Sequence, residues 1–173
     1  PTAVDLPLLS IEETARALSL DAADISFDGH APGLHQGGTR CFHVPVKTRA
    51  ALARSRPIEP HWSAIVKNLG VDMAYLYTRG GDHPKTTFRA RMYAPTAGIP
   101  EDPATGSATA LFAAQLRKAE KLADGTHGWE LEQGYEMGRP SDLHLEADVS
   151  KGKLTAVRVA GQAVQLMQGV LDI

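Results

Sequence analysis

Residues 98–108 read Gly-Ile-Pro-Glu-Asp-Pro-Ala-Thr-Gly-Ser-Ala, a stretch that places two carboxylates and a turn directly before a helix start. Asp102 precedes Pro103, which favours an extended backbone at Asp102, and Gly106 lets the chain approach a ligand without a Cβ in the way. Residues 107–116 follow with a helix-forming sequence. The first N–H groups of a helix lack partners within it and bind anions well. The stretch is therefore a candidate binding site.

A purely structural interpretation of the same residues also exists. Asp and Thr near a helix start are common N-cap residues, and Pro is common in turns. The combination favours a site, because Asp102 would repel an anion while the neighbouring amides would attract one. Such a pairing suits a substrate that carries a carboxylate at one end and exchanges a proton at the other. On the sequence alone, both interpretations stay open.

Further motifs extend the pattern. Together with residues 91–95 (Arg-Met-Tyr-Ala-Pro), the stretch resembles the signature of the phenazine-biosynthesis PhzF-like family, which shares the diaminopimelate-epimerase fold. The resemblance continues through residues 132–134 (Glu-Gln-Gly) and 137–141 (Met-Gly-Arg-Pro-Ser) to 157–164 near the C-terminal end. Before Val71 only the pattern of helices and strands fits.

The resemblance implies a division of labour between two similar halves. In the family, the first half carries a glutamate that acts as general acid/base, together with a Gly-His pair that lines the substrate. No counterpart of that segment occurs in these 173 residues, so the chain is expected to be the second half with a short piece before it. The missing N-terminal half is then an expected partner. Family members are often homodimers, so a homodimer is expected as well.

The resemblance also assigns roles to site residues. Asp102 is the expected catalytic residue, which polarises the substrate or relays a proton, while Gly106 and Ser107 are expected to bind the substrate carboxylate. Diaminopimelate epimerases and proline racemases use a thiol from each half, whereas the equivalent-looking position here is the carboxylate of Asp102, which disfavours an amino-acid racemase. The implied reaction is a proton shift within a cyclic or conjugated carboxylic acid, as in the dihydro-hydroxyanthranilate step of phenazine synthesis, and it needs no metal or organic cofactor. The alternative is a half-fold that binds a small acid, or another protein, without catalysis.

Composition narrows the class of protein. A formal net charge of −2 provides no basic surface for nucleic acid or an anionic membrane, and no apolar stretch is long enough to span a bilayer. The single cysteine, Cys41, cannot form an internal disulfide; a buried structural thiol and a reducing compartment fit it best. The seven histidines show no metal-ligand spacing with Cys or Glu, so no metal site is expected. We expect a cytoplasmic protein with a small-molecule partner.

Hydrophobic patterning predicts an α+β fold. The helix after Gly106 is apolar nearly all round, which indicates burial on every side. With strands before and after it, the expected architecture is a curved, largely antiparallel, barrel-like sheet wrapped around this central helix. The other predicted helices cover 10–18, which opens on a capping box, and 61–69, and the predicted strands cover 41–47, 73–78, 86–93, 129–137, 142–149, 154–160 and 163–171. Residues 1–38 are expected to be a leading segment and connection, with 22–38 mobile, and residues 39–173 the half-fold domain.

Overall fold

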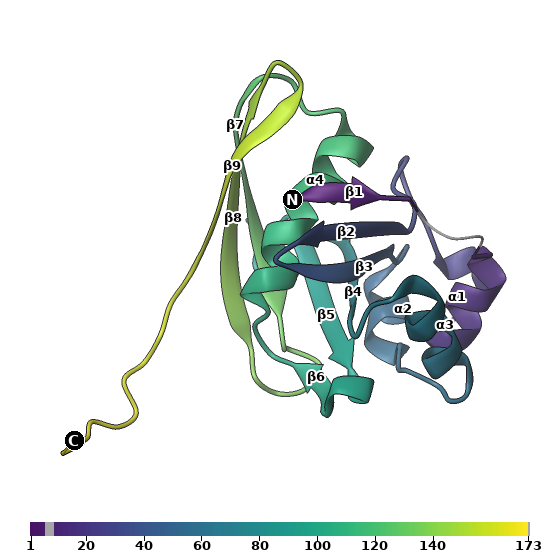
Figure 1. The fold of residues 1–173 in the computed structure, drawn as a ribbon, viewed down its shortest axis with the longest axis horizontal. Helices are drawn as coiled ribbons and strands as arrows, with labels where there is room; N and C mark the ends of the chain where they lie inside the picture. Colours follow the sequence, from purple (N-terminus) through teal and green to yellow (C-terminus); the bar gives the residue numbers. More distant parts are fainter. Residues whose placement is uncertain (6–8, 173) are drawn as a thin grey trace.

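One curled sheet organises the molecule, which the computed structural model describes for residues 1–5 and 9–172. Within those residues the sheet has nine strands in the order β1-β2-β3-β4-β5-β7-β8-β9, with β6 paired to β5 outside this path (Figure 1). Two neighbouring pairs, β3 with β4 and β5 with β7, are parallel, and the other pairs are antiparallel. The strands are β1 (Thr2–Val4), β2 (Gly33–Gly37), β3 (Thr39–Pro45), β4 (Ala74–Arg79), β5 (Phe88–Ala94), β6 (Ile99–Asp102), β7 (Gly125–Gln133), β8 (Ser141–Ser150) and β9 (Lys153–Gly161).

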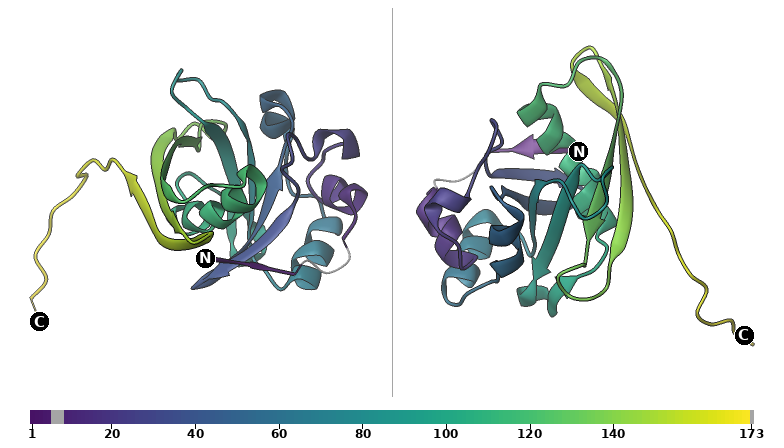
Figure 2. Two further views of the ribbon diagram at one scale, coloured as in Figure 1. Left: turned by 90° about the horizontal axis from the view of Figure 1, so that it is seen from above. Right: turned by 180° about the vertical axis from the view of Figure 1, so that it is seen from behind.

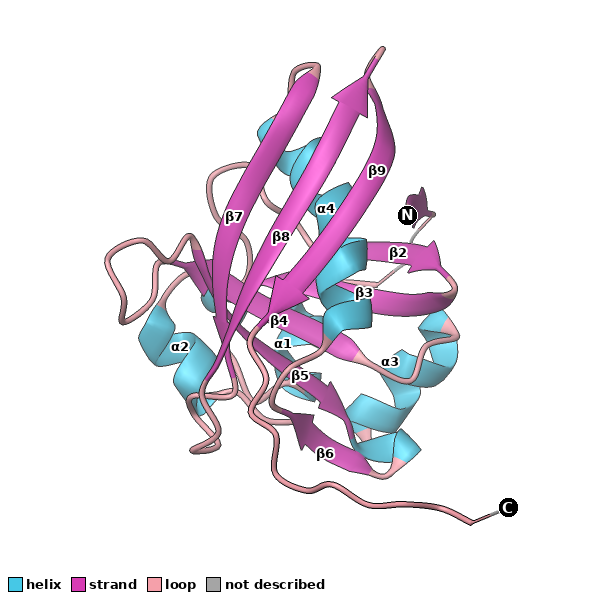
Figure 3. Cartoon of the chain, turned by 90° about the vertical axis from the view of Figure 1, so that its left-hand side faces the viewer, coloured by secondary structure: helices cyan, strands magenta, loops and turns pink. Residues whose placement is uncertain are grey.

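Four α-helices of the described chain cover the two faces of this sheet. They are α1 (Ile11–Ala17), α2 (Arg49–Arg54), α3 (His61–Leu69) and α4 (Gly106–Glu120), accompanied by the short 3₁₀ helices η1 (Ala22–Asp24) and η2 (Pro95–Ala97). Figure 2 shows α1, α2 and α3 gathered on one side and α4 inside the curl of the sheet. The three long strands β7, β8 and β9 pass across α4 (Figure 3). The expected α+β architecture is confirmed.

Alternation along the strands produces two apolar cores. In β4, for example, Ala74 and Leu76 pack in the core with α1 and α3, whereas Tyr75 and Tyr77 pack in the core with α4. This follows because successive side chains of a strand point to opposite faces. Residue Leu111 of α4 belongs to the second core, and residues 108–109 and 111–116 of that helix are buried. The burial predicted for the helix is therefore confirmed.

The C-terminal segment corrects one prediction. Residues 163–171 were expected to form a strand, but residues 162–172 have no regular secondary structure and extend away from the sheet (Figure 1). Val164, Leu166 and Met167 are more than four-fifths exposed. A strand needs a hydrogen-bonding neighbour, and in the described part of the chain this segment has none.

The structure of residues 22–38 also differs from what the sequence predicted. This region was expected to be a mobile connection, but it holds η1 and β2, with His30, Leu34 and His35 buried. Gly33 allows close packing, because a Cβ there would lie 2.4 Å from the side-chain oxygen of Gln115 on α4. The division predicted between residues 38 and 39 falls in the turn between β2 and β3, and the predicted segments include residues 6–8 and 173, which lie outside the described residues.

Candidate active site

Asp102 is the last residue of β6, and its position depends on the strand beside it. Asp102 lies opposite Met92 of β5, while its neighbour Glu101 points to the other face of the sheet, as alternation requires. There Glu101 accepts two hydrogen bonds from Arg91, of 2.9 and 2.8 Å. The ion pair therefore holds β6 in the register that leaves Asp102 on the side of α4.

Arg91 is anchored in turn by the end of another helix. Its Nη1 donates to three backbone carbonyls at the C-terminal end of α2, those of Leu52, Ala53 and Ser55. Carbonyls at the end of a helix lack partners within it and carry partial negative charge. The Arg91 guanidinium therefore stabilises the C-terminal end of α2 and pairs with Glu101 at the same time.

A closed set of hydrogen bonds connects Asp102 to the start of α4. The Thr105 hydroxyl lies 2.6 Å from Asp102 Oδ2. The fully buried side chain of Gln133, at the end of β7, contacts both residues: Nε2 lies 2.7 Å from the Asp102 carbonyl oxygen and 2.8 Å from Thr105 Oγ1, and Oε1 accepts from the Thr105 backbone N–H at 3.1 Å. The turn before α4 is thus held by a residue that is distant in sequence.

The first turn of α4 is open to solvent. Thr105 occupies the N-cap position, but its side chain makes no capping hydrogen bond, because the hydroxyl is engaged with Asp102. Gly106 and Ser107 are exposed, and a Cβ on Gly106 would meet no atom within 4 Å. The described chain therefore shows no internal packing reason for glycine at this position. The N-cap interpretation of Asp102 and Thr105 is wrong for their side chains.

Gly134 shows how closely β7 approaches the site. Its φ is +79°, and a Cβ there would lie 2.3 Å from the Arg139 carbonyl oxygen and 2.8 Å from that of Pro103. Every residue with a side chain is strained at this φ and would also collide with the backbone. The glycine therefore allows the segment after Gln133 to lie against the turn that carries Asp102.

With the site described, comparison with known proteins identifies the family. The profile of the phenazine biosynthesis-like protein family, PhzC-PhzF, matches residues 3–169. The chain belongs to this family. The PhzF-like identity expected from residues 98–108 and their companion motifs is therefore confirmed.

Relatives of this PhzF-like chain are named as isomerases. An uncharacterized isomerase of Mesorhizobium japonicum is 35% identical over 160 residues, which cover 91% of this chain and 53% of the relative. A trans-2,3-dihydro-3-hydroxyanthranilate isomerase of Pseudomonas chlororaphis is 37% identical over 152 residues, 88% of this chain and 51% of the relative. The crystal structure of a PhzF-family protein of Bacillus anthracis superposes with a TM-score of 0.74 at 20% identity, covering 90% of this chain and 56% of that one. The chain spans about half the length of the relatives that it matches.

In this PhzF-like chain Asp102 ends β6, Gly106 and Ser107 begin α4, and Thr105, which bonds Asp102, lies between them. The role of Gln133 was not predicted, although residues 132–134 were noted as part of the resemblance. Little in the sequence signalled it, because β7 mixes polar and apolar residues (Gly-Thr-His-Gly-Trp-Glu-Leu-Glu-Gln) and glutamine is seldom buried. Its partners could not be named, since they lie 28 and 31 residues away.

The residue before Gln133 secures a neighbouring loop. Glu132 is buried and accepts hydrogen bonds from the backbone N–H groups of Asp82 and His83, from the Thr86 hydroxyl and from Arg89. Burial raises the pKa of Glu132, but these hydrogen bonds and the Arg89 charge outweigh it and leave that pKa below its usual value. The carboxylate therefore fastens the loop between β4 and β5 to β7.

Two buried histidines lie beneath the first turn of α4. His43 Nε2 is 3.2 Å from the Ala108 carbonyl oxygen, and the Nδ1 atoms of His43 and His35 are 3.1 Å apart. A carbonyl only accepts, so His43 donates from Nε2 and its Nδ1 accepts from His35. Burial lowers the pKa of His43 to about 3 and, with the nearby Lys118 charge, that of His35 to about 4. Both rings are neutral at pH 7, which agrees with a structural role.

The described residues show neither a metal-binding cluster nor a membrane-spanning helix. Residues 1–5 and 9–172 contain no group of three or more His, Cys, Asp or Glu side chains arranged to hold a metal ion. Cys41 is a free, buried thiol, as predicted, and burial raises its pKa. None of the helices in the described residues is long and apolar enough to cross a membrane.

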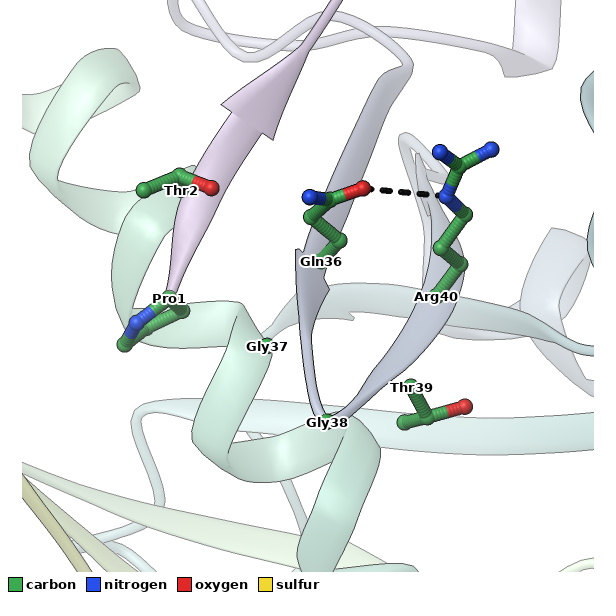
Figure 4. A pocket seen from close by; sticks show the side chains of 7 residues that line it. All are labelled: Pro1, Thr2, Gln36, Gly37, Gly38, Thr39 and Arg40. Carbon is green, nitrogen blue, oxygen red and sulfur yellow. Dashed lines mark hydrogen bonds between the residues drawn. The ribbon is translucent and has the colours of Figure 1, made fainter.

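Several surface pockets of the described residues lie away from Asp102. One of about 430 Å³ is lined by the chain start and the β2–β3 turn, where Arg40 Nε donates to Gln36 Oε1 at 3.0 Å (Figure 4). Gly106 and Ser107 are exposed and Asp102 is half-buried. The candidate site is therefore accessible on this chain.

Proposed function

We propose that this chain is the C-terminal, substrate-binding half of an isomerase that shifts a proton within a small cyclic carboxylic acid without a cofactor. The observation that carries the proposal is the pairing of Asp102 with the uncapped start of α4. Of the two carboxylate oxygens of Asp102, only Oδ2 has a hydrogen-bond partner among the described residues, and the N-cap side chain makes no hydrogen bond to the first N–H groups of the helix. An acid and an anion-binding group therefore face the same open surface.

Each of the three residues has a distinct task in this proposal. The N–H groups of Gly106 and Ser107, with the Ser107 hydroxyl, bind the substrate carboxylate, because a helix start favours negative charge. Asp102 polarises the reacting end or relays its proton. The open space over Gly106 allows the carboxylate to approach the backbone. Relatives named as isomerases support the reaction class.

The principal acid/base of this reaction is proposed to lie on another polypeptide segment. Glu101, the other carboxylate of the motif, is bound to Arg91 on the opposite face of the sheet, so it does not serve as a second acid beside Asp102. A family-type first half, carrying the glutamate, would cover the open face. A cytoplasmic location remains part of the proposal and rests on the free thiol of Cys41.

Isotope exchange tests the proposed activity. The probe is trans-2,3-dihydro-3-hydroxyanthranilate, the compound in the name of the Pseudomonas chlororaphis relative. In deuterated water, the chain alone is expected to incorporate no deuterium into the probe. The same chain with the first half of the Mesorhizobium japonicum relative supplied is expected to do so.

Each alternative outcome has a clear meaning. Rapid incorporation by the chain alone would contradict the assignment of the principal acid/base to the missing half. Binding of the probe without any exchange, once the first half is present, would favour the alternative of a non-catalytic domain that binds a small acid.

The exposed C-terminal segment supports the proposed partners. Residues 162–172 carry five large apolar side chains that are 82–93% exposed: Val164, Leu166, Met167, Val170 and Leu171. Apolar groups gathered on an exposed segment mark an interaction site. We expect the chain to self-associate, as a homodimer, or to bind the missing half through this segment.

Sedimentation across a concentration series measures this association. Removal of residues 162–172 is expected to shift the chain towards monomer, because the apolar contact is lost. The matched control replaces Gln162, Gln165 and Gln168 by serine, which changes the same segment without removing its apolar side chains. A chain with its segment intact that stays monomeric at high concentration would argue against the homodimer.

A further inference from the structure

The side chain of Gln133 has only one possible orientation in its pocket. One end of the amide faces the Asp102 carbonyl oxygen, which can only accept, and the other faces the Thr105 backbone N–H, which can only donate. The nitrogen of the amide must therefore point to Asp102 and the oxygen to Thr105. If the amide were flipped, its oxygen would face the Asp102 carbonyl oxygen and its NH₂ group would face the Thr105 N–H, so neither hydrogen bond could form.

This orientation also determines the direction of the Thr105 hydroxyl. The second proton of Gln133 Nε2 is donated to Thr105 Oγ1 at 2.8 Å, which uses a lone pair of that oxygen. The single proton of the hydroxyl is then donated to Asp102 Oδ2 at 2.6 Å, because a carboxylate oxygen accepts. The hydrogen bonds thus run in one direction, from Gln133 through Thr105 to Asp102.

The direction of these hydrogen bonds affects both the start of α4 and the carboxylate of Asp102. A threonine at the N-cap position usually accepts a hydrogen bond from an N–H of the first helical turn, but here the hydroxyl is turned to Asp102 and does not. The N–H of Ser107, the second residue of the helix, therefore stays available beside that of Gly106, which an N-cap side chain does not reach. The carboxylate of Asp102 is held through one oxygen, while the described residues show no partner for Oδ1.

We propose that Gln133 is a positioning residue that keeps the Thr105 hydroxyl on Asp102 and thereby prevents it from capping α4. The inference rests on the proposed function, since it assumes that a carboxylate binds at the N–H groups of Gly106 and Ser107. Without the Gln133 amide, the Thr105 side chain is free to rotate to the N-cap geometry. It then competes with the ligand for the N–H of Ser107, because an N-cap side chain accepts from the second or third N–H of the helix.

Benzoate, a cyclic carboxylate, is the probe for this competition. Its binding to the chain is followed through the backbone amide NMR signals of Gly106 and Ser107. Gln133→Met is expected to weaken benzoate binding about ten-fold, the equivalent of one charge-assisted hydrogen bond. Adding Thr105→Val, which removes the competing hydroxyl, is expected to restore the affinity. A merely structural role of Gln133 predicts no such rescue by a second change in the same contact.

The matched control is Gln115→Met. Gln115 is also buried, and its amide donates to the Ala31 carbonyl and to the Tyr77 hydroxyl. This variant loses similar bonds in the middle of α4 and is expected to leave benzoate affinity unchanged. If the unmodified chain binds benzoate and Gln133→Met binds it equally well, the inference is overturned while the proposed function stands. If the unmodified chain shows no saturable response, the proposed function fails and this inference fails with it.

A second measurement applies even if Gln133→Met does not fold. In the unmodified chain, the Thr105 hydroxyl proton is expected to exchange slowly with water and to show proximity to Asp102, because it is held between Gln133 and a carboxylate. Thr105→Ser keeps the hydroxyl and is expected to keep the signal. A Thr105 hydroxyl that rotates freely in the folded chain overturns the inference.

Discussion

Acidification from pH 7 to pH 5 is expected to remove about 2–4 kcal/mol of stability from this chain, because two buried histidines resist protonation in the folded state. Their pKa values are lowered from 6.5 to about 3 for His43 and about 4 for His35, chiefly by burial. Between these values and 6.5, the unfolded chain binds more protons than the folded chain. Stability is therefore complete above pH 6.5 and decreases as the pH falls towards 4 and 3.

The magnitude follows from proton linkage. Each imidazole that is neutral only in the folded state costs roughly 1.4 kcal/mol per pH unit in this window. The two together remove a large share of a typical stability of about 5–15 kcal/mol. Below pH 4.5 the lowered pKa of Glu132 acts in the same direction, because its carboxylate contributes stability above that value and loses it on protonation.

Urea unfolding at pH 7.5, 6.5 and 5.5 measures this dependence. His43→Gln, whose amide can still donate to the Ala108 carbonyl, is expected to flatten the slope by about half. His61→Gln is the matched control, because His61 is exposed at the start of α3 and its replacement should leave the slope unchanged. Equal stability of the unmodified chain at pH 7.5 and 5.5 would show that the buried histidines do not control the acid response.

Asp102→Asn is expected to lower turnover by about 10²–10⁴-fold in the enzyme completed with its first half, the usual contribution of a positioned acid or base. Asparagine keeps the size of the side chain and an oxygen that can accept from Thr105, so substrate affinity should change less than turnover. Ser107→Ala removes a hydroxyl from the substrate carboxylate and should weaken binding by roughly 1.5–3 kcal/mol. The two substitutions therefore separate chemistry from binding.

The test measures melting temperature, substrate affinity and turnover for both variants and compares them with the unmodified protein. Neither substitution should unfold the protein, because Asp102 and Ser107 lie outside the core and residues 111–116 of α4 are unaffected. A purely structural role of the two residues would have the opposite signature, a loss of about 1 kcal/mol of stability with unchanged activity. That result would refute the assignment of this site.

Local sequence determined much of the fold. The capping box at Ser10 and Glu13 forms as predicted, and α3 has the predicted bounds, with Gly70 in the left-handed conformation after its end. The apolar sequence of α4 predicted a helix surrounded by strands, whereas the place where a ligand meets the chain stays a prediction. These features depend on residues within one or two turns of each other, so a single chain segment contains the information.

The tertiary structure decided the rest. Whether Thr105 caps α4 or turns to Asp102 depends on Gln133, which reaches the site only through the pairing of β5 with β7. The sequence pattern of residues 163–171 predicts a strand, yet the segment has no regular secondary structure, because the described chain offers it no neighbouring strand. The histidine pair likewise required β2 and β3 to meet under α4. Propensity and capping act between near neighbours, whereas hydrogen-bond partners and burial are set by what the fold places opposite each residue.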